Sequence, residues 1–474
     1  MNSNKRFLNW WTILAALVIG LLGAISIASI HMSIGPDTQK LRCSTWWIMQ
    51  GMTPYKVLIE FNQPGTILYF AALLTVSLAD ECFRIADQLV LALCAWLLWR
   101  LGAGNNFRLA PALCFVGFHL MFLGANGTMQ RELVVVCCFL GAATLIFAKR
   151  GKTSMVMAGL LIGYASTVKV NAILFAVPLA IFALTTKQAK RWWVLPGIAI
   201  PWVVTIAWIE KIQVMPDFVW TMTELTPFYA GDHSYGFMPS TPMWMRFTFM
   251  ALVLLVSTLA LIRSPSRHNV MWSMALLGIV HVVAQNKGFP YHFIPLVAFG
   301  SLALMETAQR LEWIGVRMIA VGLALTWPVM YFVPSDEAHV RALEEAYPAT
   351  PSLMGVIEKL PRDARIQPLA FVDDVPNALF RTGRLPATGM QYDLCLFMGS
   401  DSKTRRGMRD RFFSEVQLRP PDYFVTAKAS DPRGYDKFKA WPEFAEWLQD
   451  HYTMESFDND AFRVYRRNDL VTSR

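Results

Sequence analysis

A succession of apolar segments fills the first 332 residues and limits the chain to one class of fold. Each segment is long enough to cross, or nearly cross, the roughly 30 Å of hydrocarbon in a bilayer. Since 54% of all residues are hydrophobic and 13% aromatic, a soluble protein of this length is excluded. The sequence therefore predicts an all-α polytopic membrane bundle of about 11 transmembrane helices. The segments are approximately 10–31, 84–103, 108–124, 133–148, 153–168, 171–185, 192–210, 246–263, 269–285, 291–306 and 314–332.

The composition changes near Val333. Of the 34 acidic residues 22 lie beyond that point, with 20 of the 43 Lys and Arg, which leaves a net charge of +11 before it and −2 after it. Short apolar runs in the tail, 367–373, 421–427 and 461–465, have the pattern of strands, and 441–452 has that of a helix. We therefore predict a transmembrane domain over 1–332 and a soluble α/β domain over 333–474.

The Lys and Arg residues of the short loops predict the orientation. They fall on one face if the segments alternate, and this face is expected to be cytoplasmic. The N-terminus is then cytoplasmic, and the tail lies on the opposite side with the outer loops 32–83, 125–132 and 211–245. The apolar stretch 66–79 is interpreted as a helix lying along or dipping into the outer leaflet. A further full span there would move the later Lys and Arg loops to the opposite face. The net charge of +9 thus reflects topology and does not indicate nucleic-acid binding.

Carboxylates are unevenly placed in the membrane part. Of its 12 Asp and Glu residues, all but Glu306 and Glu312 fall on the predicted outer face. Asp37 follows Gly35 and Pro36 directly after the first span, at the membrane surface. It is a candidate general base, or an anchor for a sugar hydroxyl or a divalent cation. The alternative is that Asp37 caps a helix over 38–50.

Four motifs follow one another on the predicted outer side. The first is Asp37, an amphipathic helix, Gly51, Pro54, Tyr55, Glu60, Asn62, Pro64 and Gly65; the second is the run Gly127 to Leu133 (GTMQREL), which contains Arg131 and Glu132. The third is Gly159, Gly163, Lys169 and Asn171, and the fourth is Lys287, Gly288, Tyr291, His292 and Pro295.

In their order and placement these motifs resemble the integral-membrane GT-C glycosyltransferases, in particular the bacterial branch related to protein mannosyltransferases and lipid A aminoarabinose transferases. The sequence departs from that pattern at Gln63, where a proline is common, at Met129, which interrupts a Gly-Gln pair, and after Glu132, where a histidine is absent. The resemblance covers roughly residues 5–332.

The resemblance implies a GT-C-like fold in the cell inner membrane, with the tail in the periplasm. It also implies transfer of a sugar from a polyprenyl-phosphate-linked donor to an envelope acceptor, which is a lipid, a glycan or a protein, with inversion at the anomeric carbon. The expected partners are this donor, the acceptor and membrane lipids, and no nucleic acid. No cofactor is certain; a divalent cation stays open, although the outer carboxylates show no defined coordination pattern.

The chemistry of the motif residues agrees with these roles. Asp37 is the predicted catalytic base, and the predicted ligands of the donor phosphate are Arg131, Lys169, Lys287 and His292. Support for the acceptor, the sugar or the local structure is predicted for Tyr55, Glu60, Glu132 and Tyr291. Plainer structural interpretations remain: an Arg131–Glu132 ion pair, a Lys169 side chain that extends to the interface, and a core histidine at 292.

Two other classes of function stay open. A transporter or flippase of lipid-linked sugars would also place charges in such a bundle, although repeated halves and broken midplane helices are not apparent in the sequence. A non-catalytic scaffold of envelope polysaccharide assembly would tolerate exchange of Asp37 and of the basic residues.

Overall fold

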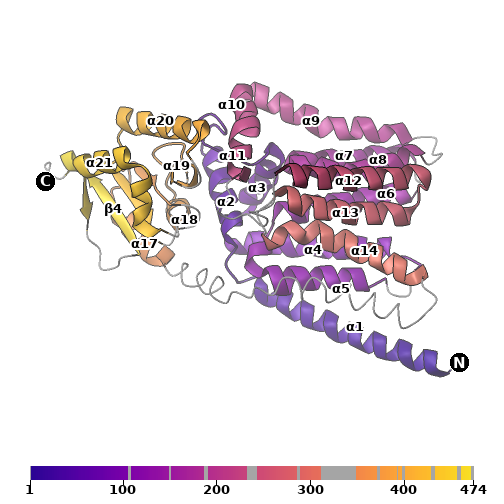
Figure 1. The fold of residues 1–474 in the computed structure, drawn as a ribbon. Coiled ribbons are helices and arrows are strands. Elements are labelled where there is room, and N and C mark those ends of the chain that lie inside the picture. Colours follow the sequence, from indigo (N-terminus) through magenta and orange to yellow (C-terminus); the bar gives the residue numbers. More distant parts are fainter. Residues whose placement is uncertain are drawn as a thin grey trace. The chain divides into compact units, whose positions relative to one another are not determined.

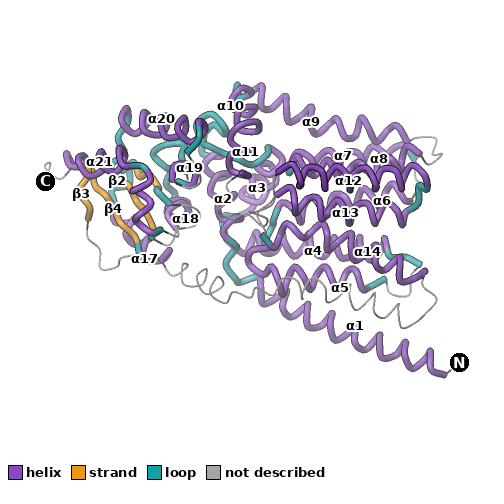
Figure 2. Tube along the Cα trace, viewed as in Figure 1, coloured by secondary structure: helices purple, strands orange, loops and turns teal. Residues whose placement is uncertain are grey.

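The structure is a computed structural model. It describes residues 2–104, 108–148, 151–185, 191–231, 243–285, 289–310, 349–370, 374–391, 393–397, 401–428, 433–455 and 461–470. Helices predominate, and the strands lie near the C-terminus (Figures 1 and 2). The chain divides into two compact units. Unit 1 comprises 1–35, 62–208 and 235–333, and unit 2 comprises 36–61, 209–234 and 334–474.

Unit 1 is a helical bundle. Ten of the predicted spans coincide with its helices, and the eleventh, 314–332, lies outside the described residues. The helices are α1 (Asn2–Ser29), α3 (Pro64–Val76), α4 (Asp80–Leu101), α5 (Ala110–Gly117), α6 (Arg131–Phe147), α7 (Lys152–Val168), α8 (Ile173–Thr185), α9 (Val194–Lys211), α12 (Met243–Arg263), α13 (Arg267–Gln285) and α14 (Ile294–Arg310).

Four helical stretches are by themselves long and apolar enough to cross a membrane: 80–101, 110–127, 194–211 and 245–263. Shorter apolar helices lie at 15–29, 64–76 and 170–185. The helical class is therefore confirmed, whereas the count of about 11 spans stays a prediction. The stretch 66–79 belongs largely to helix α3, and its predicted position along the outer leaflet is likewise still a prediction.

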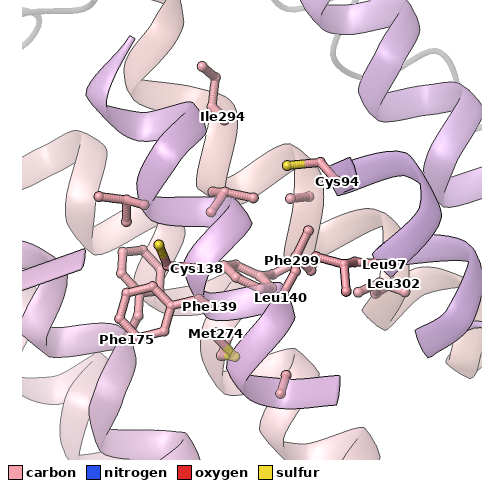
Figure 3. Packing of buried hydrophobic residues seen from close by; sticks show 14 of the residues in the cluster. Cys94, Leu97, Cys138, Phe139, Leu140, Phe175, Met274, Ile294, Phe299 and Leu302 are labelled. Atoms are coloured by element: carbon pink, nitrogen blue, oxygen red, sulfur yellow. The ribbon is translucent and has the colours of Figure 1, made fainter. Parts of the chain in front are cut away.

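The core of unit 1 is aromatic and aliphatic (Figure 3). Helix α6 packs against α4 and α7, and α13 packs against α12 and α14. Phe175 of α8 contacts two other rings of this core, with its ring centroid 5.7 Å from that of Phe139 of α6 and 5.8 Å from that of Phe299 of α14. Where helices exchange lipid contacts for contacts with one another, such rings stabilise the bundle by van der Waals packing, and each well-oriented aromatic pair adds about 0.5–1.5 kcal/mol.

Small residues bring α7 and α9 close together. Gly159 and Gly163 are one turn apart on α7, and Gly197 faces them from α9. A methyl group at Gly159 would lie 2.8 Å from the Cα of Gly197. This is the small-xxx-small packing by which membrane helices gain van der Waals contact.

Unit 2 joins two stretches of the membrane part to the tail. Its helices are α2 (Pro36–Met49), α10 (Met215–Trp220), α11 (Thr226–Gly231), α17 (Ala349–Lys359), α18 (Asp374–Arg381), α19 (Leu394–Phe397), α20 (Lys403–Leu418) and α21 (Pro442–His451). A four-stranded sheet has the order β1 (Ile366–Pro368), β2 (Tyr423–Ala427), β4 (Phe462–Arg467), β3 (Tyr452–Glu455). Strands β1 and β2 are parallel and the other pairs antiparallel. The α/β character of the tail is as predicted, although β1 is shorter than the run 367–373.

Buried hydrogen bonds attach α2 to the tail. Arg42 is fully buried; its Nη2 donates to Asn377 Oδ1 at 3.1 Å, and its guanidinium lies 4.6 Å from the ring centroid of Phe380. Trp47 Nε1 donates to the carbonyl of Arg384 at 3.1 Å. Since polar groups withdrawn from water must find partners inside the protein, these contacts fix the position of α2 in unit 2.

Two glycines of neighbouring helices provide a test of the bundle packing. A Cβ at Gly278 of α13 would lie 2.7 Å from the Cα of Leu296, whereas at Gly300 of α14 the nearest atom would be 3.8 Å away. We expect Gly278→Ala to lower the midpoint of thermal unfolding in detergent by a few degrees, because overpacking costs about 1–3 kcal/mol. The control Gly300→Ala should be neutral or slightly stabilising. Equal effects of the two variants would contradict this packing.

Candidate functional site

A loop held by α4 precedes helix α6. The π-helical turn Phe118–Leu123 ends at Gly124, which has a φ of +50°, and the chain then passes through Met129, which has a φ of +48°. A left-handed conformation is unfavourable for methionine and persists only where its surroundings impose it. The loop continues directly into Arg131 and Glu132 in the first turn of α6.

Two charged residues of α4, one turn apart, impose this conformation. Arg84 donates to the carbonyls of Met32, Ser33 and Gly124. Asp87 accepts from the backbone N–H of Met129 at 2.7 Å, and its other oxygen lies 2.9 Å from Nε2 of His119. The backbone at the start of α6 is therefore fixed by buried charged groups, which make stronger hydrogen bonds than neutral ones.

Arg131 is half-buried at the first position of α6. Its Nη1 donates to Asn62 Oδ1 at 2.5 Å. Nearby, Tyr69 of α3 donates to the carbonyl of Met129 at 3.1 Å. The ion pair of Glu132 in the described residues is with Lys169, so an Arg131–Glu132 pair is not needed to compensate the charge of Glu132, and that alternative stays a prediction.

Glu132 is the centre of a buried cluster. The Lys169 ammonium forms an ion pair with Glu132 Oε1, and Nε2 of His281 and Nε2 of His292 each lie 3.7 Å from the same oxygen. Within the described residues Glu132 Oε2 has no hydrogen-bond partner. Four segments meet here: the start of α6, the end of α7, α13 and the 3₁₀ turn Pro290–Phe293. We call the side chains of Glu132, Lys169, His281 and His292 the Glu132 cluster.

Lys169 is buried within the protein. Its side chain is 6% exposed and paired with Glu132, which speaks against the alternative in which the ammonium extends to water. Isolated charges are costly to bury, and Glu132 and Lys169 therefore compensate one another. Two imidazoles beside the pair add hydrogen-bonding groups that accept or donate according to tautomer.

Aromatic rings surround the histidine of the fourth motif. The ring of Tyr291 lies edge-on to His292 at 4.7 Å between centroids, and Phe289 lies 5.7 Å from His292. His281, which the sequence analysis did not single out, lies inside an apolar run of α13. The signal that could have identified it is the presence of an ionisable residue within a membrane segment.

Three further predicted site residues, Asp37, Tyr55 and Glu60, belong to unit 2. Asp37 lies in the first turn of α2, which begins at Pro36, so it is not the N-cap of a helix over 38–50. One turn later, the Lys40 ammonium lies 5.3 Å from the ring centroid of Phe61 and 5.8 Å from that of Tyr229. This contact of a cation with two rings was not anticipated from the sequence.

Tyr55 and Glu60 are buried in unit 2. Tyr55 has a φ of +65° and packs edge-on against Phe218, with centroids 5.1 Å apart. Burial, and secondly the charge of Glu60, raises the pKa of Tyr55 well above its ordinary value, so the phenol keeps its proton. The predicted sugar contacts of Tyr55 and Glu60 stay predictions. Lys287 lies outside the described residues.

Among the residues that the structure describes, no three or more His, Cys, Asp or Glu side chains converge as a metal site requires. The Glu132 cluster instead holds an ammonium group beside its carboxylate. The arrangement is suited to charge compensation and proton exchange, and Arg131 adds a guanidinium at its edge.

Comparison with known proteins identifies the fold. No family model and no curated protein matches the sequence. The solved structure of ArnT from Cupriavidus metallidurans bound to undecaprenyl phosphate is similar, with a TM-score of 0.57, 13% identity, and coverage of 96% of this chain and 98% of the ArnT chain. The apo state of the same ArnT gives a TM-score of 0.50 with the same identity and coverage. The predicted resemblance to lipid A aminoarabinose transferases of the GT-C type is thus confirmed for the fold.

The Glu132–Lys169 pair can be tested by removing one charge and then both. We expect Glu132→Gln to destabilise the protein by about 3–5 kcal/mol, because it removes the carboxylate that is ion-paired with the buried Lys169 ammonium. The double variant Glu132→Gln/Lys169→Met should recover most of this loss. Thermal unfolding in detergent measures both. A single variant as stable as the wild type would contradict the buried pair.

Proposed function

We propose that the protein is an integral-membrane glycosyltransferase of the cell inner membrane. It transfers a sugar from a polyprenyl-phosphate-linked donor to an envelope acceptor on the periplasmic face. The observation that supports this most is the meeting of Glu132, Lys169 and His292 from three separate motifs in a fold like that of ArnT, which has been solved with undecaprenyl phosphate. A lipid-phosphate donor requires cations fixed at the end of a membrane bundle.

The basic residues bind the donor phosphate in this proposal. Arg131 grips the phosphate through a planar guanidinium, and Lys169, Lys287 and His292 add charge or hydrogen bonds. Glu132 holds Lys169 in place before the donor arrives. Since the charges are fixed in advance, they stabilise the phosphate as it leaves without having to reorganise.

Asp37 acts as the base. It takes the proton of the acceptor hydroxyl while the hydroxyl oxygen attacks the anomeric carbon. The bond between that carbon and the phosphate oxygen breaks, and the polyprenyl phosphate leaves with the electron pair. Direct displacement of this kind inverts the anomeric configuration. The acceptor is a lipid, a glycan or a protein, with Tyr55, Glu60 and Tyr291 assigned to support of the sugar or acceptor.

The predicted topology completes the proposal. The N-terminus is cytoplasmic and the tail periplasmic, as the distribution of Lys and Arg indicates. The transmembrane domain 1–332 carries the donor chemistry, and the domain 333–474 lies outside the membrane.

Replacement of Asp37 tests the base. Asp37→Asn should lower the rate of sugar transfer by about 10²- to 10⁴-fold, the usual contribution of a general base. Donor binding should change little, because the phosphate ligands are intact. Transfer of radiolabelled sugar from extracted polyprenyl-phosphate donors measures the rate. The exposed Glu224 of unit 2 provides the control Glu224→Gln, which should transfer normally. Normal transfer by Asp37→Asn would refute the assignment, and donor binding without transfer by the wild type would favour a flippase or scaffold.

Replacement of Arg131 tests phosphate binding. Arg131→Gln removes a charge-assisted contact worth about 1.5–3 kcal/mol, so undecaprenyl phosphate should bind about 10- to 100-fold more weakly. Competition of undecaprenyl phosphate with a labelled donor gives the affinity. The amide group of the substituted side chain can still donate to Asn62, so loss of folding is not expected. Unchanged affinity would remove Arg131 from the phosphate site.

A further inference from the structure

A polar pocket lies at the end of unit 1 opposite to the Glu132 cluster. It has a volume of about 250 Å³ and is formed by the ends of α4, α13 and α14. Arg267 lies 14 residues before His281 on α13, and at 1.5 Å per residue this places the pocket about 21 Å along the helix from that histidine. The pocket is therefore separate from the proposed donor site.

The pocket is lined by charged and polar side chains that do not satisfy one another. Arg267 Nε lies 2.7 Å from Glu306 Oε1, which is an ion-pair distance without the alignment of a hydrogen bond. His268 Nδ1 lies 3.8 Å from Glu306 Oε2 and has no hydrogen-bond partner in the described part of the chain. Arg310 adds a second guanidinium. Two arginines and one carboxylate leave a net charge of +1, with the histidine neutral.

Two contacts join the helices around these groups. Gln309 Nε2 donates to the carbonyl of Gly104 at 3.1 Å and thereby joins the end of α14 to the segment after α4. The Arg267 guanidinium lies 5.6 Å from the ring centroid of Phe147, at the end of α6. Helix α13 begins at Arg267, so its positive end is directed at the pocket.

We propose that this pocket binds a phosphate group that carries a single negative charge. Guanidinium groups match phosphate oxygens in geometry, and a helix N-terminus adds backbone donors. A phosphodiester carries one negative charge and would therefore neutralise the net charge of +1. Basic pockets between transmembrane helices bind the headgroups of anionic lipids. On α12, which packs against α13, Leu259 and Ile262 are 56% and 59% exposed and offer an apolar surface for acyl chains.

The phosphate has two sources, an anionic phospholipid or free inorganic phosphate. The test uses the full chain in a neutral detergent. Phosphatidylglycerol, zwitterionic phosphatidylcholine and inorganic phosphate are titrated separately, and bound ligand is counted by native mass spectrometry alongside thermal unfolding. The wild type should retain phosphatidylglycerol in preference to phosphatidylcholine. Stabilisation by inorganic phosphate, lost in the same variants, would identify the free anion as the ligand.

Substitutions of the pocket residues test whether the ligand binds at this pocket. Arg310→Gln should weaken phosphate binding about tenfold, since it removes one charge-assisted contact. The double variant Arg267→Gln/Glu306→Gln removes the ion pair as a unit and leaves the net charge at +1. It should still weaken binding, because one of the two guanidinium groups that contact the phosphate is lost. Arg263→Gln, an exposed arginine at the end of α12, is the matched control and should bind as the wild type does. Equal retention by all variants, or no preference of the wild type for an anionic ligand, would overturn the proposal. Because the readout is binding, it does not depend on sugar transfer.

Discussion

The ion pair between Glu132 and Lys169 is the interaction on which the polar end of unit 1 depends. Both side chains are buried, and the charge of each lowers the free-energy cost of burying the other. The pair joins the start of α6 to the end of α7 and attracts the imidazoles of His281 and His292. A buried pair adds little net stability over apolar side chains of the same size. Its presence in an apolar bundle is therefore consistent with a role in chemistry, as we propose for donor binding.

The sequence predicted the helices of unit 1 well because apolar length is a local property. Glu132, Lys169 and His292 were each found as part of a motif, but the contact between them was not predicted, because Glu132 and Lys169 are 37 positions apart. His281 escaped notice because a histidine in an apolar run looks the same whether it packs in a core or faces a carboxylate. The contact of Lys40 was missed because its neighbours Phe61 and Tyr229 come from distant segments of the chain.

Unit 2 was the least predictable part. Composition separated the tail from the membrane part, and short apolar runs located three of its strands. Nothing in the local pattern of 36–49 showed that Arg42 and Trp47 would be buried. A polar helix after a membrane span usually faces water, and only its partners Asn377 and Arg384 explain the burial. Such pairing at long sequence separation cannot be read from periodicity, which reports one element at a time.

The attachment of α2 to the tail also sets the order of events during synthesis. Arg42 and its partner Asn377 are 335 residues apart. At a ribosomal rate of about 5–20 residues per second, α2 waits roughly 17–67 s before that partner emerges. Throughout this interval a helix with a buried arginine and tryptophan has no tail to cover it. Docking of α2 onto the tail must therefore follow synthesis of Asn377 and the segment around it.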